Sequence, residues 1–400
     1  MALPPLARSI RQPARNQGRS WGTLLAEARS MSLRIAQVAP LVESVPPVLY
    51  GGTERVVSHL TEEQVRAGYD VTLYASADSV TAGRLRPQSP RALRMDGRGS
   101  DPLADHLVMI DQVFREASLY DVIHLHTDYL HLPLAARCAT PTITTLHGRL
   151  DLPGIRRIFR TFRALPFASI SDAQRAPMPW LNWTGTVYHG LPEESHTFVP
   201  SPEPYLAFLG RVSPEKGLDR AIEIAVRSEM PLRIGAKVDA ADQEYFEAEI
   251  RPLLDHPLVE FLGEIGGTDK DTLLGNATAL LFPISWPEPF GLVMIESLAC
   301  GTPVIAFPSG SVPEVLQEGE TAFLVRSVEE AADAVRNVGA LDRRRCREVF
   351  EDRFSARRMA DEYLKLYRRL TEDPDEGRRF YTSRKRARST LRASQVRPAG

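Results

Sequence analysis

The chain has 400 residues, which are too many for one typical hydrophobic core and therefore predict two or three domains. Its formal net charge of −2 gives no reason to expect nucleic acid as the main partner. No apolar run is long enough to span a bilayer, and the three widely spaced cysteines exclude a disulfide framework and favour a reducing cytoplasm.

Residues 1–30 are basic, contain prolines, are poor in acids and lack the apolar core of a secretion signal. We interpret them as a disordered basic arm. The alternative is that translation starts at Met31, directly before the first predicted strand.

The first strand is predicted at 33–39, and a loop with Gly51 and Gly52 leads from it into an amphipathic helix. A glycine pair between a strand and a helix lets the backbone approach a phosphate group, although a plain strand-to-helix turn is the alternative. Ser171 and Asp172 are expected to cap a later helix. The rest of this half is predicted to form a loop at 78–102, a helix at 107–118 and strands at 71–75, 121–126, 142–146, 167–171 and 185–188.

Three histidines in this half are candidate site residues. His124 and His126 lie two residues apart on one strand and so share a face. No third metal ligand is near them in sequence, so a hydrogen-bonded pair near a cleft is favoured over a metal site. His147 follows the strand at 142–146 and precedes a glycine, so it is expected to face the cleft, with a bond to the backbone as the alternative.

A proline-rich stretch at 191–204 is predicted to link the two halves. The second half opens with a strand at 205–209, followed by the turn GRVSPEKG. In that turn Arg211 can hold phosphate oxygens with its planar guanidinium, and Lys216 can act as a point charge. The alternative is a solvated basic turn. Strands at 232–236 and 259–262 follow, and the second of them ends before Glu264.

Residues 279–307 are predicted to form a strand, a loop held open by prolines, a helix and a further strand. The N–H groups of Phe290, Gly291 and Leu292 should be free at the start of the helix, which makes an anion site. Glu288 precedes this helix and Glu296 lies on its apolar face. Donors for phosphate and carboxylates for hydroxyls together match a sugar nucleotide, although a helix start that favours acids is the alternative.

Two Asp-x-Asp triplets, Asp269–Asp271 and Asp373–Asp375, are interpreted as structural, so no metal is expected. The chain is predicted to end with a loop and strand within 310–324, a helix at 329–338 and an amphipathic helix at 354–370. Residues 376–400 are interpreted as a disordered basic tail, with weak peripheral contact to an anionic membrane as an open alternative.

The segment PEPFGLVMIESLACGTPVIA resembles the E-x7-E region of the family-4 retaining glycosyltransferases, which are group 1 enzymes of GT-B architecture. The turn from Gly210 to Gly217 is similar to the G-R-x-x-x-x-K-G diphosphate clamp of that family, and the residues ending in His147 and Gly148 are similar to its T-x-H-G motif. This resemblance covers about residues 31–372 and implies the following organisation. An N-terminal Rossmann-like acceptor domain (31–195) and a C-terminal Rossmann-like nucleotide-sugar domain (200–350) face a central cleft, and a helix at 354–372 crosses back to the first domain.

The resemblance also implies site roles. Glu288 would contact the donor sugar, and Glu296 would hold the ribose. His147 would touch the donor sugar or the acceptor, while the loop at Glu264 would border the base. The remaining implied contacts are to the diphosphate, from Arg211, Lys216, Gly51, Gly52 and the N–H groups of 290–292. The family usually has Asn-Gly where this chain has His189 and Gly190, so the role of His189 stays open.

The implied function is metal-independent transfer of a sugar, with retention, from a nucleotide-diphosphate sugar to a hydroxyl acceptor that is a sugar, a lipid-linked compound or a small molecule. No cofactor is expected. The alternatives are a nucleotide-sugar epimerase of similar fold and a non-catalytic homologue that only binds sugar nucleotides. A dehydrogenase is disfavoured because no G-x-G-x-x-G follows the first strand.

Overall fold

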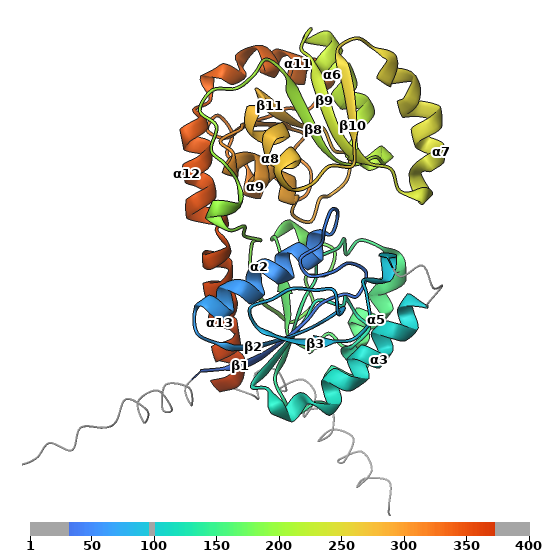
Figure 1. Ribbon diagram of the computed structural model, residues 1–400, viewed down its shortest axis with the longest axis vertical. Helices are drawn as coiled ribbons and strands as arrows, with labels where there is room; N and C mark the ends of the chain where they lie inside the picture. Colours follow the sequence, from blue (N-terminus) through green and yellow to red (C-terminus); the bar gives the residue numbers. More distant parts are fainter. Residues whose placement is uncertain (1–31, 96–100, 373–400) are drawn as a thin grey trace, which may run out of the picture.

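The computed structural model describes residues 32–95 and 101–372, which form two parallel α/β domains (Figure 1). Seven parallel strands make the first sheet: β1 (Arg34–Val38), β2 (Asp70–Ala75), β3 (Arg84–Pro87), β4 (Val122–Leu125), β5 (Thr142–Thr145), β6 (Phe167–Ser169) and β7 (Trp183–Thr186). Their order across the sheet is β3-β2-β1-β4-β5-β6-β7.

Six parallel strands make the second sheet: β8 (Leu206–Arg211), β9 (Leu232–Lys237), β10 (Val259–Gly263), β11 (Ala279–Phe282), β12 (Val304–Ala306) and β13 (Ala322–Leu324). Their order is β10-β9-β8-β11-β12-β13. The central strand β4 is fully buried along its length, as expected of a parallel sheet that helices cover on both faces.

Helices separate most of the successive strands. Those of the first domain are α2 (Gly52–Arg66), α3 (Pro102–Arg115), α4 (Leu132–Ala135) and α5 (Arg156–Thr161). Those of the second are α6 (Leu218–Arg227), α7 (Gln243–Tyr245), α8 (Gly267–Asn276), α9 (Leu292–Ala299), α10 (Val312–Val315), α11 (Val328–Asn337) and α12 (Arg343–Phe354), and α13 (Ala356–Glu372) follows. The prediction of two Rossmann-like α/β domains is confirmed.

In each sheet the strand order reverses beside the first strand. β1 lies between β2 and β4, and β8 lies between β9 and β11. Ligands bind outside the carboxyl ends of the strands at such a switch point. The loop after β1 carries Gly51 and the loop after β11 carries Glu288, so two of the loops predicted to be functional leave the sheets where ligand sites form.

The end of the described chain crosses between the domains. α12 packs against α9 of the second domain, whereas α13 buries Met359, Tyr363 and Tyr367 in one cluster with Ile35 and Val122 of the first sheet. Figure 1 shows the two helices in red along one side of both domains. The predicted crossing of the C-terminal helix back to the first domain is therefore confirmed.

Helix α12 was not predicted, because the sequence pattern indicated a helix only from residue 354, close to where α13 begins. In the structure Phe354 ends α12 and Ala356 begins α13. At the break the N–H of Leu191 donates to the carbonyl of Phe354 at 2.9 Å, and the N–H of Ala356 donates to the carbonyl of Leu191 at 2.8 Å. The link between the domains thus pairs with the chain where it crosses back.

Three further expectations need correction. The predicted loop at 78–102 contains the edge strand β3, whose sequence RLRP is half exposed and polar because one side of it has no neighbour. Helix α3 begins at Pro102, earlier than predicted, because the side chain of Asp101 accepts from the N–H of Leu103. After Ser171 only a single 3-10 turn forms, although its hydroxyl does accept from the N–H of Gln174.

Several predictions fall outside the described residues: the arm at 1–30, the triplet Asp373–Asp375 and the tail at 376–400. Within residues 32–95 and 101–372, no helix combines the length and the apolar character needed to cross a membrane.

Candidate active site

Both domains line one cleft of about 490 Å³. Every side chain or glycine predicted to act lies on its wall: Gly51, Gly52, His147, Arg211, Lys216, Glu264, Glu288, Phe290, Gly291, Leu292 and Glu296. The first domain contributes the loop after β1, the start of α2 and the end of β5, and the second contributes the ends of β8, β9 and β10 and the start of α9. Residues up to 245 apart in sequence are thus brought to one surface, from Gly51 to Glu296.

Lys216 and Glu288 form a contact in this cleft. Nζ of Lys216 lies 2.5 Å from Oε2 of Glu288, and both side chains are largely buried. The lysine comes from the turn after β8 and the glutamate from the loop after β11. Gly310 supports that loop: its φ is +61°, and a Cβ there would lie 2.4 Å from the backbone N and O of Glu288. The acid is therefore fixed by both its own charge partner and a close backbone contact.

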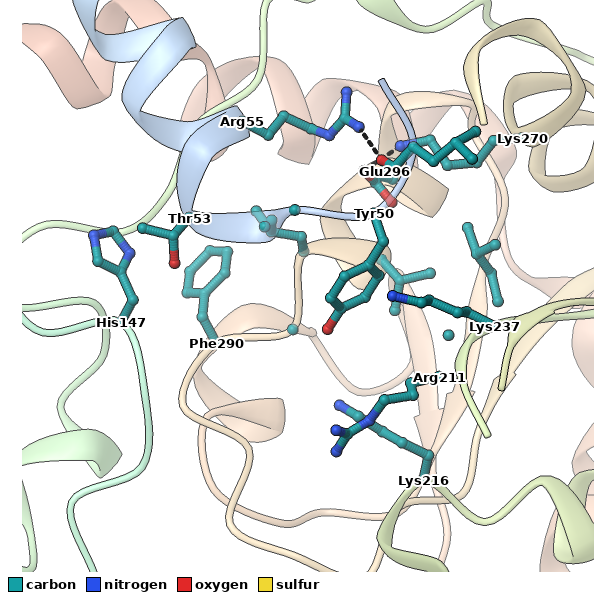
Figure 2. A pocket seen from close by; sticks show the side chains of 18 of the residues that line it. Tyr50, Thr53, Arg55, His147, Arg211, Lys216, Lys237, Lys270, Phe290 and Glu296 are labelled. Carbon is teal, nitrogen blue, oxygen red and sulfur yellow. Dashed lines mark hydrogen bonds and ion pairs between the residues drawn. The ribbon is translucent and has the colours of Figure 1, made fainter. Parts of the chain in front are cut away.

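Arg211 lies at the end of β8 among three acids. Its Nη2 is 2.8 Å from Oε1 of Glu215, and its other nitrogens are 3.8 Å from the carboxylates of Asp239 and Asp242. Lys237, at the end of β9, pairs with Asp239 at 2.8 Å and lies 5.2 Å from the ring centre of Tyr50. Figure 2 shows Arg211, Lys216 and Lys237 on the second-domain side of the cleft. Three cations close together make this wall suited to a polyanion.

Glu296 also has a cationic partner. Nζ of Lys270, from α8, lies 2.6 Å from its Oε1, and the two side chains are 15% and 7% exposed. Burial raises the pKa of Glu296, but the charges of Lys270, His196 and Arg55 outweigh it and bring the pKa to about 2. Figure 2 shows Arg55, from α2 of the opposite domain, directed toward the same carboxylate. Glu296 is therefore an ionised hydrogen-bond acceptor.

The start of α9 offers backbone donors. Gly291 caps the helix with a φ of +81°, and neither its N–H nor that of Leu292 has a hydrogen-bond partner within the described residues. A Cβ on Gly52 would lie 3.5 Å from Cδ1 of Leu292. The glycine turn of one domain thus lies against the helix start of the other, with free N–H groups between the cationic wall and the acids.

His147 is held in place by a hydrogen bond to a second histidine. Its Nε2 lies 2.8 Å from Nδ1 of His126, and burial lowers the pKa of His147 to about 3, so its ring is neutral. The rings of His124 and His126 are 4.0 Å apart but bond to other partners rather than to each other. His189, whose role the sequence left open, stacks on His147 with ring centres 5.3 Å apart.

The Asp269–Asp271 triplet lies in α8, as predicted, and Asp271 accepts hydrogen bonds from the N–H of Thr197 in the linker. Among the described residues no three histidines, cysteines or acids are grouped so that they could hold a metal ion. Asp271 therefore bonds to the linker, and its neighbour Lys270 is the residue of the triplet that lines the cleft.

The sequence matches two family models in succession. Residues 50–192 match the model described as Glycosyltransferase Family 4, and residues 193–349 match the model described as Glycosyl transferases group 1. The chain belongs to the group 1, family-4 glycosyltransferases.

Similar proteins extend over most of this glycosyltransferase. A phosphatidyl-myo-inositol mannosyltransferase of Mycobacterium leprae is 25% identical over 327 residues, which cover 75% of this chain and 85% of the relative. A crystal structure of a glycosyltransferase involved in avilamycin A biosynthesis has a TM-score of 0.67 at 24% identity and covers 85% of this chain and 98% of its own. Anabaena HepE in complex with UDP-glucose has a TM-score of 0.64 at 18% identity, covering 85% and 100%. The predicted GT-B fold is thereby confirmed.

Sequence reasoning missed part of the site of this glycosyltransferase. Lys270, Lys237, Arg55 and Tyr50 all line the cleft. A signal for the first was present: a lysine in the first turn of α8 is unfavourable for the helix dipole and therefore asks for a specific partner. For Arg55 and Tyr50 no signal existed, because their contacts depend on how the two domains face each other.

Proposed function

We propose that this glycosyltransferase moves a sugar from a nucleotide-diphosphate sugar to a hydroxyl acceptor with retention at the anomeric carbon and without a metal ion. The observation that carries the proposal is the pairing of two acids of the cleft with lysines, Lys216 with Glu288 at 2.5 Å and Lys270 with Glu296 at 2.6 Å. The free N–H groups at the start of α9 belong to the same wall. Such a surface binds phosphates and sugar hydroxyls together.

The diphosphate leaving group is proposed to bind Arg211, Lys216 and the N–H groups of Gly291 and Leu292, with the turn at Gly52 closing over it. These donors stabilise the negative charge that develops as the glycosidic bond breaks. Three acids hold the guanidinium of Arg211 in position before substrate binds. The diphosphate then takes the place of some of these acids as its partner.

The acids are proposed to hold the sugars. Glu288 orients the donor sugar and stabilises positive charge on its ring, and the ionised Glu296 accepts hydrogen bonds from the ribose hydroxyls. Glu264 borders the base. Because Glu288 is paired with the ammonium group of Lys216, it acts electrostatically and not as a covalent nucleophile. The acceptor then attacks the face that the diphosphate leaves, which retains the configuration.

Two similar proteins support this choice of substrates. HepE was solved with UDP-glucose, which agrees with a nucleotide-diphosphate sugar as donor. The Mycobacterium leprae relative is a phosphatidyl-myo-inositol mannosyltransferase, which agrees with a hydroxyl acceptor that is free or lipid-linked. We propose that the reaction takes place in the cytoplasm, and contact of residues 376–400 with a membrane stays a prediction.

The first test is a panel of sugar nucleotides screened for thermal stabilisation. A donor at about 100 times its dissociation constant stabilises the folded protein by about 2.7 kcal/mol. With that donor, Glu288→Gln, Arg211→Met and Lys216→Met are expected to lower kcat by about 100-fold or more, measured at a temperature at which circular dichroism shows each variant to be folded. Arg227→Met, on the far surface of α6, serves as the matched control.

The anomeric configuration of the product distinguishes retention from inversion. This configuration, measured by NMR during the first turnovers, should match that of the donor, and added EDTA should leave the rate unchanged. Inversion, full activity of Glu288→Gln, or strong inhibition by EDTA would contradict the proposal. An epimer formed from donor alone would favour an epimerase, and binding without transfer or donor hydrolysis would favour a non-catalytic protein.

A further inference from the structure

A line of polar side chains connects the crossing helix α13 to the cleft. The hydroxyl of Tyr367 lies 3.1 Å from Nε2 of both Gln37 and Gln64. Oε1 of Gln37 lies 3.0 Å from Nε2 of His126, whose Nδ1 lies 2.8 Å from Nε2 of His147. All of these residues except His147 are buried, and His147 lines the cleft. A tyrosine on α13 is therefore linked to a residue in the proposed sugar site.

The direction of these hydrogen bonds follows from the chemistry of each group. An amide oxygen only accepts, so His126 must carry its proton on Nε2 and donate to Gln37. Burial lowers the pKa of both His126 and His147, so each ring is neutral and has one N–H. His126 Nδ1 is then an acceptor, and His147 must donate to it from Nε2. Nδ1 of His147 is left without a proton.

The hydroxyl of Tyr367 sets the orientation of the two amides. It has one proton and can accept two hydrogen bonds. In the observed arrangement it accepts from Nε2 of Gln37 and of Gln64 and donates to Nδ1 of His124 at 2.7 Å. Gln37 also donates to Oε1 of Gln64 at 2.9 Å. Every close contact then pairs a donor with an acceptor.

Other orientations fail this requirement. Turning one amide over would place two oxygens or two NH₂ groups of Gln37 and Gln64 against each other. Turning both would place two amide oxygens near Tyr367, whose single proton can serve one of them. The other would face the tyrosine oxygen with no proton between them, which is an unfavourable contact of two acceptors. Tyr367 therefore selects the amide orientation and, through Gln37 and His126, the tautomer of His147.

We propose that Tyr367, Gln37 and His126 are positioning residues that hold His147 as the Nε2–H tautomer, so that its Nδ1 accepts a hydrogen bond from a substrate hydroxyl. The substrate part of this inference rests on the proposed function. Nδ1 of His147 is buried and has no partner within the described residues. A hydroxyl of the bound sugar or acceptor supplies the missing donor, whereas a fluorine or a methoxy group at the same position does not.

The tautomer is measurable without any substrate. The full chain is labelled with ¹⁵N in its nine histidine rings, and His147 is assigned by the signal that His147→Asn removes. Two-bond ¹H–¹⁵N correlations distinguish a protonated ring nitrogen from a bare one. We expect His147 to be protonated at Nε2 and bare at Nδ1. The opposite tautomer, or a mixture of both in the wild type, would overturn the inference without touching the proposed function.

The role of Tyr367 is tested with Tyr367→Phe against Tyr363→Phe. Tyr363 lies one turn earlier on α13, is equally buried, and bonds through its hydroxyl to Thr145 rather than to the two glutamines. Tyr367→Phe should give a mixture of His147 tautomers and Tyr363→Phe should not. An unchanged tautomer in Tyr367→Phe, or the same mixture in both, would overturn the role of Tyr367. If Tyr367→Phe does not fold, the wild-type spectrum still decides the tautomer.

Transfer assays add a second measurement, using the donor found by the stabilisation panel. Losing one neutral hydrogen bond should lower kcat/KM of Tyr367→Phe by about 3- to 10-fold, with Tyr363→Phe close to wild type. At His147 itself, asparagine places an acceptor near the Nδ1 position and glutamine near the Nε2 position. His147→Asn should therefore retain more transfer than His147→Gln, and the reverse order would contradict an accepting Nδ1.

Discussion

A Lys270→Met substitution leaves the carboxylate of Glu296 buried without its ammonium partner. The two side chains are 15% and 7% exposed and lie 2.6 Å apart. Removing one partner of a buried ion pair costs about 3–5 kcal/mol, because the other charge stays in a poorly solvated place. Methionine keeps the length and most of the apolar stem of lysine, so packing around α8 should change little.

The pKa of Glu296 gives an independent magnitude. Burial raises it, but Lys270 and neighbouring groups bring it to about 2, against an ordinary value of 4.5. A lowered carboxyl pKa contributes stability that is present above the ordinary value and is lost as the pH falls toward 2, here about 3 kcal/mol. Without Lys270 the sign reverses, because burial then raises the pKa and the ionised form costs stability at neutral pH.

We therefore expect Lys270→Met to lower the free energy of unfolding by about 3 kcal/mol at pH 7. The loss should be clearly smaller at about pH 5, where the carboxyl of Glu296 takes up a proton in this variant. Urea titrations followed by tryptophan fluorescence at both pH values measure this. Adding Glu296→Gln to Lys270→Met should restore most of the loss at pH 7. Arg227→Met, which breaks an exposed pair with Glu223, should lose at most about 0.5 kcal/mol. An equally small loss for Lys270→Met, or no recovery in the double variant, would refute the reasoning.

Three other substitutions have defined outcomes. Gly310→Ala should cost about 1–3 kcal/mol and lower transfer, because φ is +61° and a Cβ would strike backbone 2.4 Å away; Gly339→Ala, with no atom within 4 Å, should be neutral by thermal melting. Burial raises the pKa of Glu54 to about 7, so the folded protein loses stability as the pH rises from 4.5 through 7. Glu54→Gln should therefore gain about 3 kcal/mol on the wild type between pH 5 and pH 8 in urea titrations. Arg343→Met should cost about 3 kcal/mol or more, since its buried guanidinium donates to oxygens of four residues, whereas Arg344→Met on the exposed face should stay within about 0.5 kcal/mol in the same assay.

Local pattern was sufficient for most strands and for the loops that line the cleft. Buried parallel strands such as β11 and β12 are short apolar runs, and the glycines and prolines around them are visible in the sequence. The loop around Glu288 was predicted to line the cleft because its prolines exclude regular secondary structure and a helix begins directly after it. Such features depend on neighbours a few residues away.

Features that depend on distant partners were missed. The edge strand β3 is polar and gains its structure only by pairing with β2. Helix α12 was not predicted, and it is held by packing against α9. The ion pair of Lys270 with Glu296 joins α8 to α9, and although the position of Lys270 indicated that it needs a partner, the sequence did not indicate which one. In each case the determining contact is tertiary, so no window of the sequence contains it.

The placement of α13 has a consequence for synthesis of the chain on the ribosome. Residues 356–372 complete the core over Ile35 and Val122, yet they are made after the whole second domain. At 5–20 residues per second, the roughly 165 residues between Leu191 and Ala356 take about 10–30 s to translate. During that interval the nascent first sheet exposes the apolar surface that α13 later covers, so the first domain cannot complete its core until the second domain has been translated.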